Sequence, residues 1–220
     1  MSIKIFVSEV SFESNFQTTH LLEYVSKDKK EKLLKYKFDI DRKLSLYSEL
    51  MVRYQIWNEH GIHNQQIVFS KNDNEKPFLR GYPNFHFNIS HTRNAIAVGF
   101  SNNKVGIDIE RIKTPDLKIA KRFFTASEKD YLFSCKNHEV AFCEIWTKKE
   151  AYIKYIGTGL STQLDSFCVL DNPISVTIYT FQTGEYIISA CCKELEDSKP
   201  IIINITESEM HTLFKSIDNH

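Results

Sequence analysis

The chain has 220 residues, 42% of them hydrophobic and 25% charged, and its 28 basic and 28 acidic side chains give no formal net charge. This length is enough to bury a core as one large domain or as two half-sized lobes. A neutral chain without a run of roughly 20 apolar residues is expected to bind neither nucleic acid nor a membrane through its overall charge or a spanning segment. The first predicted element is a strand, because the apolar residues Ile3, Ile5 and Val7 alternate with other residues. The same segment lacks the continuous apolar stretch that is typical of a signal peptide.

A long helical region is predicted next, from Leu21 to Glu59, where leucines and other apolar residues recur at helical intervals. Residues 27–43 within it hold eight basic and four acidic side chains. This local excess of positive charge is typical of a solvated helix face, and it would also suit a binding site for an anion.

Short β-like pieces follow, and the sequence predicts strands at residues 66–70, 85–91, 95–100 and 105–110. The polar turn SNNK separates the last two of these strands. We place there the boundary between an N-terminal lobe, residues 1–102, and a C-terminal lobe, residues 103–220.

The second half begins with helices and ends with strands. ASEK after Phe124 is predicted to open one helix, and a longer helix is predicted from Val140 to Ile156, ended by Gly157. The last third is rich in β-branched residues and predicts antiparallel strands at residues 166–170, 175–181, 185–192 and 200–205. We therefore expect an α+β protein in which each lobe packs helices on an antiparallel sheet. The five cysteines lack CxxC or metal-ligand spacing, which favours a reducing cytoplasm.

The strand VGIDIE, residues 105–110, places two carboxylates on one face. Val105, Ile107 and Ile109 point to one side, and Asp108 and Glu110 to the other, with about 6.5–7 Å between the α-carbons of the two acidic residues. Carboxylates this close raise each other's pKa unless a cation lies near them. Magnesium suits such oxygen ligands together with substrate phosphates. The alternative is a surface strand with an acidic solvent face.

The helix WTKKEAYIKYIGTGL adds a third acidic group. Trp146, Glu150 and Lys154 share one face of it, and Lys149 flanks that face. Glu150 would complete a carboxylate set around a metal ion, and the two lysines would neutralise phosphate oxygens. The alternative is an exposed ladder of ion pairs.

Three further residues suit phosphate binding. Ser90 and His91 lie at the end of the β-run FNISHT, and Lys76 lies in the turn before it. Their donors are of the kind that bind phosphate oxygens. A histidine at a strand end is nevertheless more often a surface or core residue, so the sequence alone leaves both possibilities open.

In this order and at these separations, FNISH, VGIDIE, FFTASE and WTKKEAYIKYIGTGL resemble the motifs of the 4′-phosphopantetheinyl transferases. The length resembles the monomeric surfactin-synthetase-activating (Sfp) type, and weaker similarity in KDKKEKLLKY and LMVRY extends back to about Ser26. The resemblance implies two similar lobes related by a pseudo-twofold axis. It also implies transfer of the phosphopantetheine arm of coenzyme A to a serine of an acyl or peptidyl carrier-protein domain, with adenosine 3′,5′-bisphosphate as the second product.

The motif match also implies roles for individual residues. Asp108, Glu110 and Glu150 would hold magnesium against the coenzyme A diphosphate, and Lys154 would contact the phosphate under attack. Glu150 is the candidate general base, directly or through a magnesium-bound water, with Lys149 assisting. The nucleotide end would be bound by Lys29, Lys32, Ser45, Lys76, Ser90 and His91, with Asp108 also contacting coenzyme A.

One position departs from the family pattern. Relatives often carry an arginine just before the position matched by Ser45, where this chain has Leu44. Arg42, two residues earlier, is the candidate substitute.

Carrier docking is expected on residues 111–124, which mix basic and apolar side chains. Carrier proteins are typically acidic helical bundles, so the basic residues would steer them, while Phe123 and Phe124 pack inward. The basic residues are Lys113, Lys118, Lys121 and Arg122.

Two other functional classes compete with the transferase. A magnesium-dependent phosphohydrolase of nucleotide diphosphates would use the same carboxylates with a positioned water and no protein partner. A basic-helix module for nucleic acid is disfavoured by the neutral net charge and by the lack of a basic face interleaved with aromatic residues.

Overall fold

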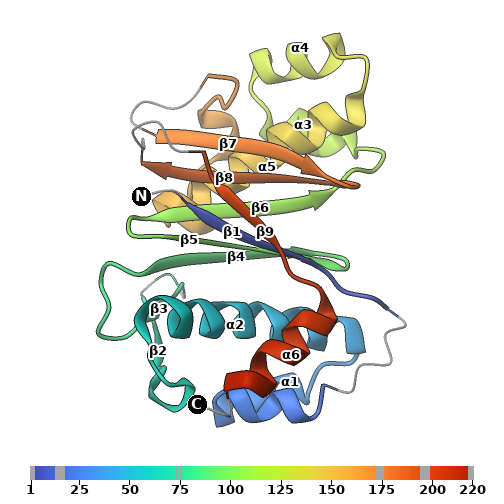
Figure 1. Ribbon diagram of the computed structural model, residues 1–220. Helices are drawn as coiled ribbons and strands as arrows, with labels where there is room; N and C mark the ends of the chain where they lie inside the picture. Colours follow the sequence, from blue (N-terminus) through green and yellow to red (C-terminus); the bar gives the residue numbers. More distant parts are fainter. Residues whose placement is uncertain are drawn as a thin grey trace.

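The computed structural model describes residues 3–12, 18–72, 74, 76–171, 176–193 and 199–217, and the statements below concern those residues. Two β-sheets lie face to face in the middle of the molecule, and helices cover the outer face of each (Figure 1). This layered arrangement of helices and largely antiparallel sheets confirms the predicted α+β class.

The first sheet has four strands in the order β4, β5, β1 and β9. Their bounds are β1 Lys4–Glu9, β4 His86–Thr92, β5 Ala95–Ser101 and β9 Ile201–Asn204. The first three of these strands pair antiparallel, as predicted. A separate two-stranded hairpin is formed by β2 (Phe69–Lys71) and β3 (Pro77–Leu79).

The helical region expected at residues 21–59 is divided into pieces. These are the 3₁₀ turn η1 (His20–Tyr24), α1 (Lys27–Leu33) and α2 (Asp39–His60), with the turn η2 (Asn64–Gln66) after them. Residues 34–38 interrupt the helix, and Asp39 and Asp41 begin the next one with negative charge in its first turn. Carboxylates there interact favourably with the helix dipole, which favours a new start at this point.

The second sheet has three antiparallel strands in the order β6, β8 and β7. Their bounds are β6 Val105–Arg111, β7 Val176–Thr183 and β8 Tyr186–Lys193. The helices over it are α3 (Leu117–Phe123), α4 (Ala126–Ser134) and α5 (His138–Ile156). α4 begins with a capping box between Thr125 and Glu128, and α5 ends at Gly157 in the left-handed conformation, as predicted.

Residues 166–170 do not form the predicted strand. Two turns, η3 (Gly159–Ser161) and η4 (Leu164–Ser166), precede residues 167–170, which form neither a helix nor a strand. The backbone groups of this segment bind side chains, since the carbonyl of Phe167 accepts a hydrogen bond from Lys149 and the amide of Val169 donates to Glu128. β-branched composition alone does not reveal such partners.

The direction predicted for the last strand was wrong. β9 pairs with β1 in parallel, whereas the sequence predicted an antiparallel strand there. The helix α6 (Glu207–Ile217) follows β9. Its side chains Met210 and Phe214, together with Ile205 before it, are buried in the core beneath the first sheet. Burial of these side chains favours the return of the chain to the first sheet. The division into lobes 1–102 and 103–220 stays a prediction.

A core between the two sheets holds the halves of the molecule together. Val105, Ile107 and Ile109 of β6 are buried in it, which confirms the predicted alternation of this strand. The backbone amide of Ile107 also donates a 2.9 Å hydrogen bond to the side-chain carbonyl of Asn88 in β4. β4 and β6 therefore lie side by side, and their polar faces meet. In the described part of the chain, no helix has the length and apolarity that a membrane span requires.

Gly106 allows α5 to lie directly against β6. A Cβ atom at this position would be 2.0 Å from the carbonyl oxygen of Ala151 and 2.4 Å from the amide nitrogen of Tyr155. Both contacts are with backbone, so a flexible side chain cannot relieve them. We expect Gly106→Ala to lower the free energy of unfolding by about 3 kcal/mol and to reduce activity, because α5 must move. Urea unfolding would measure this; Gly99→Ala, where an added Cβ would lie no closer than 3.4 Å to the side chains of Val105 and Ile107, controls for the loss of glycine.

Candidate active site

Asp108 lies at the centre of the junction between β4, β6 and α5. Its side chain is 7% exposed, and its Oδ1 accepts hydrogen bonds from Ser90 Oγ at 2.8 Å and from Lys154 Nζ at 2.7 Å. Its Oδ2 is buried and has no hydrogen-bond partner in the described part of the chain. One oxygen of this carboxylate is thus satisfied, while the other is available to a ligand.

The alternation of β4 brings its polar residues to β6. Ser90 faces Asp108, and Thr92, two residues later on the same face, donates a 3.1 Å hydrogen bond to Glu110 Oε2. The sequence analysis selected Ser90 but missed Thr92. The two-residue period of the strand was the signal that could have found it.

Three carboxylates affect one another across this junction. Burial raises the pKa of Asp108, and the positive charge of Lys154 opposes this rise. The pKa of Glu110 is also raised, mainly by burial and then by the negative charge of Asp108. The pKa of Glu150 is raised by burial, then by Asp108 and, more weakly, by Glu110. No three His, Cys, Asp or Glu side chains among the described residues are gathered closely enough to hold a metal ion. The Lys154 ammonium lies against Asp108 instead, so the three-carboxylate metal site stays a prediction.

The residues expected at the nucleotide end lie on neighbouring elements. Lys29 of α1 donates a 3.0 Å hydrogen bond to Ser45 Oγ of α2. The pKa of His91 is lowered, first by loss of hydration and then by the charge of Lys154, with a smaller contribution from Lys29. His91 is therefore close enough to Lys154 and Lys29 for their charges to affect it. Lys32 is exposed on α1, one turn beyond Lys29.

The structure also places the position that departs from the family pattern. Leu44 is 2% exposed and belongs to the core beneath the first sheet. Arg42 binds the carboxylate of Asp39. A role for Arg42 in nucleotide binding stays a prediction.

Lys76 connects the two halves through backbone groups. Its Nζ donates to the carbonyl of Val105 at 3.1 Å and to the carbonyl of Lys154 at 3.0 Å. In this position it holds the start of β6 and the end of α5 together. Contact between Lys76 and a nucleotide phosphate stays a prediction.

Lys76 predicts a pH dependence of stability. Burial, then the charges of Lys104 and Lys154, lower its pKa from 10.5 to about 8. Between these values the unfolded chain binds more protons than the folded one, so the free energy of unfolding rises with pH there. This contribution is fully present above pH 10.5 and is lost as the pH falls through 8. We expect the wild type to gain more stability than Lys76→Met between pH 7.5 and 9.5 in urea unfolding. Equal pH dependence of the two proteins would contradict this, and exposed Lys71→Met is the control.

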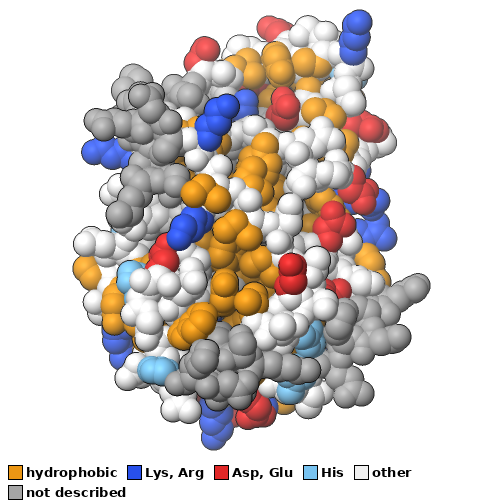
Figure 2. All heavy atoms as spheres, viewed as in Figure 1, with side chains coloured by type: hydrophobic (Ala, Val, Ile, Leu, Met, Phe, Trp, Pro, Cys, Tyr) orange, Lys and Arg blue, Asp and Glu red, His pale blue; other side chains and the backbone are white. Residues whose placement is uncertain are grey.

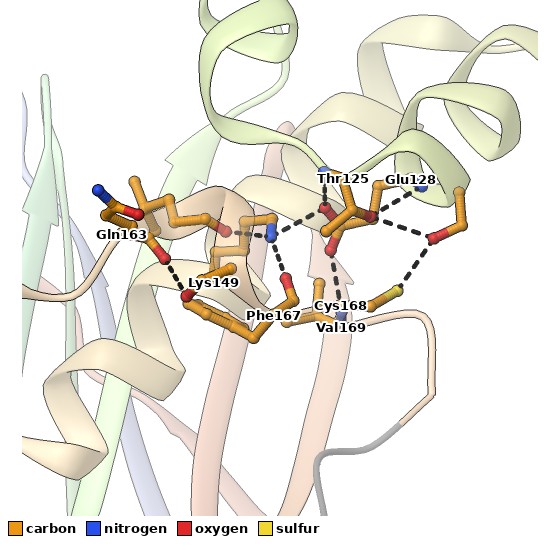
Figure 3. A network of polar contacts seen from close by, with 10 residues as sticks. Thr125, Glu128, Lys149, Gln163, Phe167, Cys168 and Val169 are labelled. Carbon is orange, nitrogen blue, oxygen red and sulfur yellow. Dashed lines mark hydrogen bonds and ion pairs between the residues drawn. The ribbon is translucent and has the colours of Figure 1, made fainter.

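Lys149 does not lie at the phosphate site, and the prediction that it assists there is corrected. Its side chain is 0% exposed, and its Nζ lies 2.8 Å from Glu128 Oε2, whose carboxylate is equally buried. The ammonium also donates to the carbonyls of Leu164 and Phe167, at 2.7 Å each (Figure 3). The helix position that flanks Glu150 thus points toward α4, away from Asp108. The sequence showed on which side of the helix Lys149 lies, but not that its partner is the buried Glu128.

Glu128 completes this network, and the sequence analysis did not select it. Its carboxylate accepts hydrogen bonds from the backbone amides of Thr125 at 2.8 Å and Val169 at 2.9 Å (Figure 3). Its ASE context predicted only a helix start. The Lys149–Glu128 pair therefore joins α5, the start of α4 and the segment 164–169.

The described geometry defines a buried acidic junction between two α+β halves, and the comparisons with known proteins identify its family. A family model of the 4′-phosphopantetheinyl transferase superfamily matches residues 104–206, and one of the 4′-phosphopantetheinyl transferase N-terminal region matches residues 13–102. The 4′-phosphopantetheinyl transferase Sfp of Bacillus subtilis strain 168 is 35% identical over 179 residues, which are 79% of this chain and 80% of that protein. The chain belongs to the 4′-phosphopantetheinyl transferase superfamily, as its motifs predicted.

Other relatives carry the same description. The chain is 39% identical over 153 residues to 4′-phosphopantetheinyl transferase psf-1 of Bacillus pumilus and 41% identical over 157 residues to 4′-phosphopantetheinyl transferase gsp of Aneurinibacillus migulanus. The matches cover 69% and 70% of this chain, respectively. They span just under two thirds of the relatives themselves, 66% and 65%.

Proposed function

We propose that this protein transfers the 4′-phosphopantetheine group of coenzyme A to a serine hydroxyl of an apo carrier-protein domain. The products are the holo carrier and adenosine 3′,5′-bisphosphate. The observation that carries the proposal is the buried Asp108, held by Ser90 and Lys154, whose Oδ2 has no hydrogen-bond partner among the described residues. Family membership supplies the substrate class.

The acidic residues fit a magnesium ion in chemistry. Carboxylate oxygens are the ligands that Mg²⁺ prefers, and the buried Asp108 Oδ2 lacks a hydrogen-bond donor. Asp108, Glu110 and Glu150 would hold the ion. When bound, it would neutralise charge on the diphosphate of coenzyme A.

The protein side chains would do the remaining work. The ammonium of Lys154, 27% exposed at its side chain, would stabilise negative charge that develops on the attacked phosphate. Glu150 would accept the proton of the carrier serine, and its raised pKa makes it a stronger base than an ordinary glutamate. Lys29, Ser45 and His91 would bind the nucleotide end; Lys29 is hydrogen-bonded to Ser45, and its charge also affects His91.

The carrier would dock on residues 111–124. Lys113, Lys118, Lys121 and Arg122 are exposed, whereas Phe124 is 1% exposed. On the neighbouring α4, Tyr131 is 39% and Phe133 is 54% exposed, and they offer apolar contacts that the sequence analysis did not select. Basic charge beside exposed aromatic rings suits an acidic helical carrier.

Charge reversal should weaken this docking. We expect Lys118→Glu with Lys121→Glu to raise the KM for the carrier about tenfold, with kcat nearly unchanged, because steering charge acts mainly on association. The loss should shrink at high salt. Steady-state kinetics with carrier and coenzyme A varied separately would measure it, with Lys193→Glu, exposed at the end of β8, as the control. A rise in the KM for coenzyme A instead would contradict this surface.

We also propose that the protein acts as a cytoplasmic monomer, without nucleic-acid or membrane partners. Free thiols at all five cysteines support a reducing compartment. The presence of both halves of the junction in one chain supports a monomeric site. Gel filtration with light scattering would test the oligomeric state.

One assay tests the proposed function. The protein is incubated with coenzyme A, magnesium and an apo carrier domain, and the carrier is weighed by mass spectrometry. Gain of one phosphopantetheine is the expected result. Cleavage of coenzyme A without modification of the carrier would indicate a phosphohydrolase, and absence of both coenzyme A binding and reaction would overturn both enzyme assignments.

A further inference from the structure

A second pocket lies at the opposite edge of the first sheet from the acidic junction. Its volume is about 310 Å³, and β1, α2, β9 and α6 contribute its walls. Ser90 belongs to β4 at one edge of this sheet, whereas the pocket lies beside β9 at the other. Figure 1 shows β9 and α6 on the face turned toward the viewer. The pocket is therefore separate from the site that would bind coenzyme A.

The walls of this pocket are largely apolar. Phe6, Tyr54, Ile203, Ile205 and Leu213 line it, and Phe6 and Ile205 are 2% and 6% exposed. Hydrophobic side chains form a band down the middle of this face of the molecule (Figure 2). The volume lies at the lower end of the range of about 300–1,000 Å³ found for small-molecule sites. It would hold about ten waters at ~30 Å³ each, so it is larger than a hydration site for one water.

One polar group at this pocket lacks a partner. Gln55 is 1% exposed and lines the pocket, and its Nε2 is buried without a hydrogen-bond acceptor in the part of the chain that the structure describes. A buried amide donor is costly unless an acceptor reaches it. Because Gln55 lines the pocket, a small movement of its side chain would bring this donor to a ligand there.

One of the two charged groups at the rim is already paired with an opposite charge. Lys4 Nζ lies 2.6 Å from Glu59 Oε1. The Glu209 carboxylate accepts hydrogen bonds from the backbone amide and the hydroxyl of Thr206, at 2.8 Å each, and the pKa of Glu209 is lowered by them. The Glu209 carboxylate would oppose an anionic ligand, and because it is exposed to water it would attract a cationic one only weakly, so the chemistry favours a neutral ligand.

We propose that this pocket binds a small neutral molecule that carries a carbonyl group on an apolar chain or ring. The carbonyl oxygen accepts a hydrogen bond from Gln55 Nε2, and the apolar part packs against Phe6, Tyr54 and Leu213. The proposal is independent of the transferase activity, since none of these residues belongs to the acidic junction.

The test uses N-hexylacetamide, a neutral amide with an alkyl chain, and the full-length protein. Titration followed by ¹H–¹⁵N NMR should give saturable shifts of the Gln55 side-chain amide, with a Kd on the order of 1 mM. Leu213→Trp, which fills the pocket, should weaken binding at least about tenfold, and Gln55→Leu should also weaken it. Leu34→Trp, at an exposed leucine, should leave binding unchanged.

The outcomes are decisive in both directions. Saturable binding that is lost in Leu213→Trp and Gln55→Leu supports the site. Absence of a saturable shift in the wild type overturns the proposal and indicates that ordered water alone satisfies Gln55. Equal binding by Leu213→Trp also overturns it, because the probe then lies elsewhere. The wild-type titration does not depend on the folding of either variant.

Discussion

Replacing Asp108 with asparagine is expected to lower the kcat of phosphopantetheine transfer by at least about 100-fold, because the variant loses the buried negative charge at the centre of the junction. The asparagine can still accept a hydrogen bond from Ser90, so the local shape is retained. Burial makes the ionised carboxylate costly in the folded state and raises its pKa. Removal of that charge should therefore leave the fold intact. Mass spectrometry of the carrier and thermal unfolding measure the two effects.

Replacing a second acidic residue, Glu150, with its amide tests the proposed general base. Glu150→Gln should also abolish transfer, since the amide cannot accept the serine proton. Glu144→Gln, on the same helix and similarly half-buried, is the matched control and should retain activity. Asp108→Ala should be as inactive as the asparagine variant. Undiminished transfer by Glu150→Gln would show that this carboxylate has no part in the reaction.

Lys149→Met is expected to lower the free energy of unfolding by about 3–5 kcal/mol, because it leaves the Glu128 charge buried without its partner. Both side chains are 0% exposed, so water cannot compensate. The variant also loses the hydrogen bonds to the carbonyls of Leu164 and Phe167. Urea unfolding measures the loss. Lys148→Met, at the preceding and only half-buried position, is the control and should change stability by less than about 1 kcal/mol.

A double variant separates the pair from the surrounding packing. Lys149→Met with Glu128→Leu removes both charges together and should recover part of the loss, since neither charge is then left unpaired. Recovery should be incomplete, because Glu128 also accepts the amides of Thr125 and Val169. Single variants that cost less than about 1 kcal/mol would show that water reaches the pair after all.

The sequence predicted those parts of the fold that depend on local pattern. The alternation of residues 105–110 and the helical period of residues 140–156 are properties of neighbouring residues, and both elements formed as expected. The partner of β9 was not predictable in this way, since β1 lies almost the whole chain earlier. Hydrophobic composition shows that a strand is to be buried, but not which sheet receives it.

In the candidate active site, too, residues within local motifs were predicted, whereas residues that depend on distant partners were not. Asp108, Ser90 and Lys154 lie in short motifs on successive elements, and the structure brings them together. Lys149 was misplaced because its partner, Glu128, is on another helix and its sequence context predicted only a helix start. Gln55 gave no signal at all, since its unsatisfied amide becomes evident only when α2, β9 and α6 are assembled.

The pairing of β9 with β1 has a consequence for how the molecule is made. The segment 201–217 leaves the ribosome after every other element, yet it supplies the outer neighbour of the first strand and places Phe214 4.9 Å, ring to ring, from Tyr24. The half that is synthesised first thus keeps an open edge and an uncovered aromatic ring until residues 201–217 have been made. Closure of this edge therefore joins two segments that lie far apart in the order of synthesis.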